Sequence, residues 1–362
     1  MVDTEDGAVT IYNPQGLPIV GYLLPDLTFR EPQFMHFAGA FGPGPVEAPL
    51  VYYSLEQGGV LKVHDDQGSS VYTSAPNLIA MAGAPAQPVI AYSLFVAPQS
   101  GYDTSSALYV GTLNAPPTEP VLTAPNEDGY ALYPLAVSAA GGQPTGVWYT
   151  TELFGIGNVA FAPRRGLFYL DLASGLITAT LPPIIGNDMG TFTNSLAGLS
   201  PDQTWMAYSM QGPNVAPTTL FWAPVDNPSQ VISVMPSINY DMGAGFAVFS
   251  PNHQYLAWNA ANSGTQPGMV TYYLQIHATD GVSGSFSEFP TAQSLLHPDL
   301  IYARTAGWLD NETLLLQGRM TDELNHVLSL GPASSIVSTD GSGQAILAQS
   351  FAIGDFLGFV YP

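Results

Sequence analysis

The sequence contains no cysteine, so disulfide bonds, thiolate nucleophiles and zinc sites with cysteine ligands are excluded. Basic residues are nearly as scarce. The 362 residues include six lysines and arginines against 28 aspartates and glutamates, a formal net charge of −22. A chain this acidic repels phosphate backbones, so we expect no nucleic-acid partner. Proteins, carbohydrates and cations remain as ligand classes.

Long helical patterns and long apolar runs are also missing. No segment keeps a 3.6-residue apolar period, and no apolar run reaches the ~18–20 residues of a membrane span. Glycine (37) and proline (32) instead separate short apolar runs. This punctuation predicts an all-β protein with many turns and no insertion into a membrane. Because residues 1–7 are acidic, we do not expect them to be a signal peptide. Because Lys62 is the only lysine, we expect an exported protein, which would be periplasmic, secreted or surface-anchored. We also expect it to be a monomer.

One strand–turn–strand segment recurs along the chain. It reads Phe-Ser-Pro-Asn-His-Gln-Tyr-Leu-Ala-Trp over residues 249–258 and Leu-Ser-Pro-Asp-Gln-Thr-Trp-Met-Ala-Tyr over residues 199–208, with a shorter copy over residues 308–316. Proline presets φ for a turn, and Asn or Asp tolerates the left-handed region. A β unit that recurs about every fifty residues predicts a repeat architecture.

The rest of the chain divides into copies of the same unit. Six complete units of four strands fit between residues 34 and 348, and residues 8–24 and 351–361 each supply half a unit. We therefore predict a single domain, residues 1–362, folded as a seven-bladed β-propeller with four-stranded antiparallel blades. The closing blade would combine residues 351–362 with residues 7–27, and residues 356–361 would pair with residues 8–12. Pairing the N- and C-terminal strands would close the ring and remove exposed sheet edges.

The two longer copies of the turn segment resemble the repeat of TolB-type, WD-repeat-like β-propellers, which carry an aromatic-Ser-Pro-Asp-Gly turn followed by a strand. The turn Ser338-Thr-Asp-Gly-Ser-Gly343 is similar to the family's outer-strand turn. The chain departs from the pattern in two ways: Asn252 stands at the usual Asp position, and the Gly is missing from all three copies. The resemblance implies the fold. It does not choose a function, because members of this broad class include periplasmic scaffolds, sugar-processing enzymes and peptidase caps.

Catalytic signatures are missing from the sequence. There is no Gly-x-Ser-x-Gly elbow and no phosphate-binding loop, and the six histidines lack metal-ligand spacing. The predicted long loops, among them residues 152–165 and 184–194, fall where a propeller gathers them on one face. We therefore predict a non-catalytic binding or scaffold module for a protein or carbohydrate, and regard enzymatic activity as unproven. The expected ligand-binding residues are Glu152, Arg164, Arg165, His297 and Arg304. The alternative is a carbohydrate-active hydrolase or lyase that uses acids such as Glu152, Asp188 or Asp241 at the channel mouth.

Four aspartates form a candidate metal site. Asn187-Asp-Met-Gly190 and Tyr240-Asp-Met-Gly243 precede inner strands of adjacent units, and Asp128 and Asp299 have similar offsets. Clustered carboxylates repel one another unless a cation neutralises them, and Ca²⁺ prefers such oxygen ligands. Asp128, Asp188, Asp241 and Asp299 are therefore candidate Ca²⁺ ligands, and no other cofactor is expected. The alternative is that each Asp caps its own turn and that Arg304 neutralises one of them.

Overall fold

The fold is described by a computed structural model. Its backbone is described for residues 2–5, 8–12, 18–23, 36–37, 52–56, 60–65, 68–84, 87–96, 104–112, 114–153, 161, 164–187, 190–211, 219–234, 240–263, 270–279, 287–290, 300–308, 313–320, 333–339, 345–352 and 355–358. Side chains are described between residues 60 and 279, with gaps, and at Thr305, Trp308 and Leu314. Nearly all of this is strand. The one helical element among these residues is the 3₁₀ turn η2 (Glu127–Gly129). In the same residues no helix is long and apolar enough to span a membrane.

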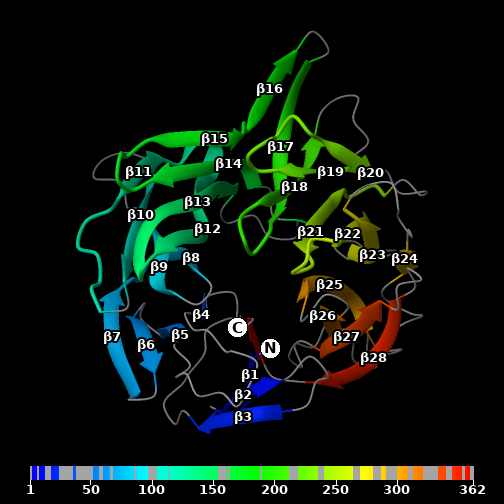
Figure 1. The fold of residues 1–362 in the computed structure, drawn as a ribbon, viewed down its shortest axis with the longest axis horizontal. Helices are drawn as coiled ribbons and strands as arrows, with labels where there is room; N and C mark the ends of the chain where they lie inside the picture. The colour runs from blue at the N-terminus through cyan, green and yellow to red at the C-terminus, as the bar shows by residue number, and fades with distance from the viewer. Residues whose placement is uncertain are drawn as a thin grey trace.

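The strands form antiparallel sheets that follow one another along the chain and lie around a common centre (Figure 1). The first three sheets contain β29 (Asp355–Gly358), β1 (Val2–Glu5), β2 (Ala8–Tyr12) and β3 (Pro18–Leu23); β4 (His36–Phe37), β5 (Tyr52–Glu56), β6 (Val60–Asp65) and β7 (Gly68–Ser74); and β8 (Leu78–Ala84), β9 (Gln87–Val96), β10 (Ser105–Thr112) and β11 (Leu122–Pro125).

The remaining sheets follow in the same order. A nine-stranded sheet contains β12 (Tyr130–Ala140), β13 (Gln143–Leu153), β14 (Arg164–Asp171), β15 (Ile177–Leu181), β16 (Ile184–Asn187), β17 (Gly190–Leu199), β18 (Trp205–Gln211), β19 (Leu220–Pro224) and β20 (Ile232–Val234). Two more contain β21 (Ala244–Phe249), β22 (Tyr255–Ser263), β23 (Val270–Ala278) and β24 (Ser287–Pro290); and β25 (Leu300–Trp308), β26 (Thr313–Met320), β27 (Ala333–Thr339) and β28 (Ala345–Ala352).

The two ends of the chain share one sheet, although the pairing differs from the prediction. We expected the C-terminal strand to pair with residues 8–12, but β29 pairs with β1, and β1 pairs with β2. The acidic residues 2–5 were not predicted as a strand. Residues 351 and 352, assigned to the closing blade, instead end β28, which pairs with β27. The terminal sheet therefore takes three strands from the N-terminus and one from the C-terminus.

The nine-stranded sheet consists of two groups that a single residue pair joins. β14 and β17 pair only through Arg165 and Ser195. The segment 184–194, predicted as a loop, contains the β16–β17 hairpin, whose ladder runs from Ile184 opposite Thr193 to Asn187 opposite Gly190. Figure 1 shows this hairpin extending beyond the neighbouring strands. Its polar, glycine-containing sequence hides the strand pattern that apolar alternation reveals elsewhere.

The core lies in layers between neighbouring sheets. Leu61 and Tyr72 of the second sheet pack with Met81, Ile90 and Tyr92 of the third. Further layers join the third sheet to β12 and β13, β14 to β17 and β18, and β19 to β21 and β22. Each fully buried large apolar side chain contributes about 1.5–3 kcal/mol. The layers hold the sheets side by side with little backbone pairing between them.

Buried polar groups add specific links between sheets. The indole nitrogen Nε1 of Trp222 donates to the carbonyl of Thr279 at 2.8 Å, and that of Trp308 donates to Val248 at 3.0 Å. The fully buried Asn259 Oδ1 accepts the backbone N–H of Thr305 at 2.8 Å. Each link joins residues at least 46 positions apart in the chain. These hydrogen bonds fix the relative placement of sheets that apolar contact alone would let slide.

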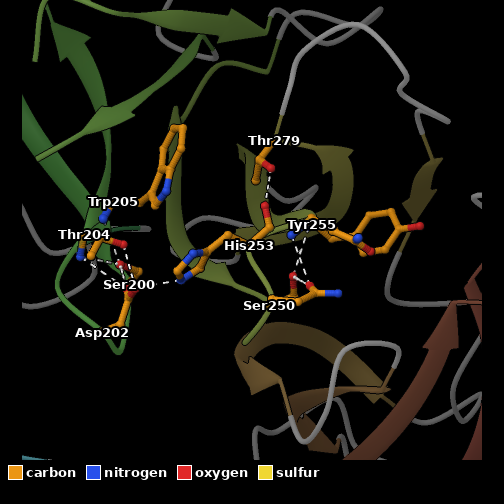
Figure 2. Close-up of polar contacts among 10 residues, drawn as sticks. Ser200, Asp202, Thr204, Trp205, Ser250, His253, Tyr255 and Thr279 are labelled. Carbon is orange, nitrogen blue, oxygen red and sulfur yellow. Dashed lines mark hydrogen bonds and ion pairs between the residues drawn. The ribbon is translucent and has the colours of Figure 1, made fainter. Parts of the chain in front are cut away.

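The recurring turns have nearly the same geometry in both described copies (Figure 2). Ser200 Oγ accepts the N–H of Trp205 at 2.8 Å and donates to Asp202, while Ser250 Oγ accepts the N–H of Tyr255 at 3.0 Å and donates to Asn252. The next residue of each turn, Gln203 or His253, has a left-handed φ of 67° or 56°. This conformation explains the glycine that the family pattern carries there.

One buried histidine makes the stability of the fold sensitive to pH. His277 on β23 is 5% exposed, and its ring lies 5.9 Å from that of Trp258 and 6.4 Å from that of Trp222, centroid to centroid. Burial lowers the pKa of His277 from 6.5 to about 4. The folded protein therefore keeps this imidazole neutral at a pH where the unfolded chain binds a proton.

We expect the free energy of unfolding to fall as the pH drops from about 7 towards 4, because the unfolded state takes up the His277 proton first. The contribution is on the order of 2 kcal/mol by pH 5. Urea unfolding at pH 7 and pH 5 should show a larger loss for the wild type than for His277→Gln, which cannot titrate. Equal losses in the two proteins would contradict this assignment.

Candidate functional site

Four of the predicted residues come together where three neighbouring strands meet. Because the strands are antiparallel, the start of β12, the end of β13 and the start of β14 lie side by side at one end of the strands. The register places Ala131, Glu152 and Arg164 directly opposite one another, and Leu132, Thr151 and Arg165 in the next row. Successive side chains of a strand point to opposite faces. The adjacent residues Arg164 and Arg165 therefore serve opposite faces of one sheet.

Arg164 is held tightly on its face. Its Nε donates to Glu152 Oε2 at 2.7 Å, and its guanidinium lies 4.7 Å from the ring centroid of Tyr133. The side chains of Arg164 and Glu152 are only 27% and 20% exposed. Burial works against the charged form of Arg164, but Glu152 and Tyr133 outweigh it and raise the arginine's pKa. Burial likewise raises the pKa of Tyr133. Arg164 therefore makes its contacts with residues of the neighbouring strands β12 and β13.

Arg165 is held more loosely on the other face. Its guanidinium lies 3.7 Å from the ring centroid of Tyr130, a cation–π stack. Its one ion pair in the described part of the chain is a 3.4 Å contact from Nη1 to Oδ2 of Asp128, whose side chain is 79% exposed. Its Nε is buried and has no acceptor there. Arg165 thus keeps hydrogen-bonding capacity that Arg164 has already used.

The approach of Asp128 to Arg165 depends on an unusual backbone. Asp128 has a φ of 54° inside η2, and Gly129 follows with a φ of 82°. Two left-handed residues in succession reverse the chain before Tyr130 opens β12. The same reversal that places the Asp128 carboxylate near Arg165 therefore also sets the tyrosine on which the guanidinium stacks.

The segment that leads into β14 also contacts a distant sheet. Phe161 lies 5.1 Å from Phe246 of β21, centroid to centroid, and packs with Met242 and Ala261. Gly245 makes room for it, since a Cβ there would lie 2.3 Å from Phe161 Cδ1. The chain that carries both arginines is therefore anchored to the sheet that begins with β21. Neither this contact nor the tyrosine stacks were predicted, although Tyr130 and Tyr133 at the start of a strand opposite an acidic–basic pair were a usable signal.

Of the other predicted residues, only Asp241 is described together with its side chain. Asp241 is exposed in the turn before β21, where its backbone N–H donates to Asn262 Oδ1 at 2.9 Å. Arg304 lies on β25, but its side chain is outside the description, and Asp188, His297 and Asp299 lie outside the described residues altogether. Asp128 contacts Arg165. Within the described residues no three histidine or acidic side chains lie close enough to hold a metal ion, so the Ca²⁺ site stays a prediction.

No family model matches the sequence. No curated protein matches it either. Among solved structures, a prolyl endopeptidase is 10% identical with a TM-score of 0.53, and the match covers 98% of this chain and 49% of that chain. Prolyl oligopeptidase B from Galerina marginata is 8% identical with a TM-score of 0.49, covering 98% of this chain and 51% of that one. The β-propeller domain of the Trilobed protease from Pyrococcus furiosus is 11% identical with a TM-score of 0.39, covering 75% and 71%.

These likenesses concern the fold alone, because all the identities are very low. The chain is an all-β protein of antiparallel sheets, and its fold is similar to that of the prolyl endopeptidase over 98% of this chain. It spans about half the length of the prolyl endopeptidase, 49%. The repeat all-β architecture predicted from the turn segments is therefore supported, while no comparison identifies the TolB type.

The two ion pairs should differ in their value to the fold. Glu152→Gln leaves Arg164 partly buried without its charged partner, so we expect a loss of about 1–2 kcal/mol, below the value for a fully buried pair. Asp128→Asn removes an exposed contact and should cost less than about 0.5 kcal/mol. Urea unfolding of both variants at pH 7 measures the difference. A larger loss for Asp128→Asn would reverse the assignment of the two arginines.

Proposed function

We propose that this chain is a non-catalytic binding or scaffold module that recognises a protein or a carbohydrate. The contact surface is the edge where β12 begins, β13 ends and β14 begins. The observation that carries the proposal is the state of Arg165, whose guanidinium is stacked on Tyr130 and whose one ion pair within the described residues is a 3.4 Å contact with an exposed carboxylate; its side chain is 27% exposed, as is that of Arg164. Its planar guanidinium has several donors in a fixed fork, which suits oxygen acceptors of a ligand.

Arg165 is a better ligand contact than its neighbour for energetic reasons. A ligand that displaces Arg164 from Glu152 would break a 2.7 Å charge-assisted hydrogen bond in a poorly exposed place. A ligand that meets Arg165 replaces only a long contact to a solvated Asp128. The stack on Tyr130 holds the guanidinium in place beforehand, which lowers the entropy cost of binding.

The arrangement of the acids supports binding over hydrolysis. A glycosidase needs two carboxylates about 5–9 Å apart that face one substrate. Glu152 pairs with Arg164 and Asp128 with Arg165, and these two arginines belong to opposite faces of the sheet. Of the acids that the alternative names, Glu152 is thus already paired with a cation, while Asp188 lies outside the described residues. We also propose that the protein is exported, that it is a monomer, and that it binds neither nucleic acid nor membranes.

The binding role gives a direct experiment. We expect labelled protein to bind a member of an array of glycans and peptides, and Arg165→Gln to weaken that hit by tenfold or more, about 1.4 kcal/mol. Calorimetry with the hit compound measures the affinity. Lys62→Gln on β6 is the matched control, since it removes one positive charge from a different sheet and should bind like the wild type. An array without hits, or an Arg165→Gln affinity equal to that of the wild type, would contradict the proposal.

The ring itself is part of the proposal: seven blades of TolB type, closed by the terminal strands. Three facts support it. The strands divide into seven groups of four or five when the nine-stranded sheet is split at the Arg165–Ser195 pair. β29 pairs with β1. The Ser-Pro-Asx turns place Gln203 and His253 in the conformation that the family's glycine favours.

Closure by the termini predicts a cooperative loss of structure on truncation. Deleting residues 353–362 removes β29 and leaves β1 as an exposed edge, so the ring should open and the melting temperature should fall by several degrees. Differential scanning calorimetry measures this. Deletion of residue 362 alone is the control, because it leaves β29 in place. A truncated protein that melts within a degree or two of the full chain would refute closure.

A further inference from the structure

The two described Ser-Pro-Asx turns do more than connect strands, because each carries a side chain that reaches the preceding unit. Gln203 Oε1 accepts the Ser138 hydroxyl at 2.6 Å, and Gln203 Nε2 donates to the Val137 carbonyl at 3.1 Å. His253 Nε2 lies 3.1 Å from Asp202 Oδ1. The first pair of contacts joins the β17–β18 turn to β12. The contact of His253 with Asp202, which Figure 2 shows, joins the β21–β22 turn to the β17–β18 turn.

Both reaching residues occupy the same strained position. Gln203 and His253 have φ values of 67° and 56°, where glycine is the unstrained choice. A side chain in this region costs on the order of 1 kcal/mol. A residue with a side chain thus stands in place of glycine at the equivalent position of both turns, and both side chains contact the preceding unit. We take this as a sign that the contact offsets the cost of the left-handed backbone.

Both ends of the His253 contact are fixed by other hydrogen bonds. Asp202 accepts from the hydroxyls of Ser200 at 2.6 Å and Thr204 at 2.7 Å. Burial raises the pKa of Asp202, but these hydrogen bonds, with a smaller contribution from His253, outweigh it and lower the pKa below its usual value. The carboxylate is therefore ionised at neutral pH. At the other end, the Thr279 hydroxyl at the end of β23 donates to the His253 carbonyl.

We infer that Gln203 and His253 form a clasp that couples three successive units of the fold: β12–β15, β17–β20 and β21–β24. The clasp lies at the end of β12 near Ser138, whereas the candidate site lies at the other end, near Tyr130. The units are thus tied together at the edge away from the proposed ligand surface. Loosening of the β21–β22 turn is transmitted to the β17–β18 turn, fifty residues earlier in the chain.

A double-mutant cycle tests the clasp. His253→Ala keeps the left-handed strain of a Cβ but removes the imidazole, and it should raise the unfolding equilibrium constant roughly two- to fivefold, the range of exposed charged pairs. In an Asp202→Ala background the same substitution should have almost no effect, because the partner is already gone. Gln254→Ala, an exposed neighbour in the same turn, is the control and should be neutral. Additive effects of the His253 and Asp202 substitutions would overturn the inference.

Native-state hydrogen exchange gives a second readout that does not need reversible unfolding. In His253→Ala the amides of Gln203 and Thr204 should exchange faster by the same two- to fivefold factor, although they are fifty residues away. The Gln203→Ala variant should likewise accelerate exchange near Ser138 at the end of β12. Changes that stay within residues 250–255 would show that His253 acts only on its own turn, and would overturn the clasp.

Discussion

Each sheet of this protein depends on its neighbours, because side chains rather than backbone hydrogen bonds hold adjacent sheets together. The described core clusters each combine residues from two successive groups of strands. A lone four-stranded sheet would leave these apolar faces in water. The single backbone pair between neighbouring groups in the described part, Arg165 with Ser195, is too little to replace them. Sheets that follow one another in the sequence therefore lie next to one another in the structure.

The candidate site follows from the antiparallel arrangement of three strands. Alternation along β14 sends Arg164 and Arg165 to opposite faces, and the register gives each row a different set of partners. One arginine meets an acid on the adjacent strand. The other meets an acid from a reversed turn and the tyrosine that follows it. Two identical, adjacent residues of equal exposure thus differ in their partners, a poorly exposed glutamate for Arg164 and an exposed aspartate for Arg165.

Much of the fold could be predicted from the sequence, and the failures have physical causes. The apolar alternation and the Ser-Pro-Asx turns located most strands within a few residues. The strand β1 was missed because its sequence, Val2–Glu5, is acidic and pairs with a strand more than 350 positions away. The β16–β17 hairpin was missed because its sequence lacks the regular apolar alternation of the other strands, and backbone pairing defines it in the structure. Local patterns report what a segment buries, and these two segments gave no such signal.

Part of the candidate site could also be predicted from the sequence. Glu152, Arg164 and Arg165 stood out as charges at the ends of one long loop in a chain with six cations, and Asp128 stood out because it precedes an inner strand. Their partners were not deducible, since the choice of Glu152 for one arginine and Asp128 for the other is made by the register. The stack of Arg165 on Tyr130 depends on the left-handed turn at Asp128, which the sequence does not announce beyond the following Gly129.

The charge balance makes the placement of these two arginines significant. With 28 acids against six lysines and arginines, most carboxylates have no cation to pair with. Two of the six cations nevertheless lie next to one another, and each has its own acid. Two of the few positive charges thus lie together at the surface that we propose for ligand binding. Near the opposite end of β12, the contacts between units are made by Gln203 and His253 and use none of the few arginines.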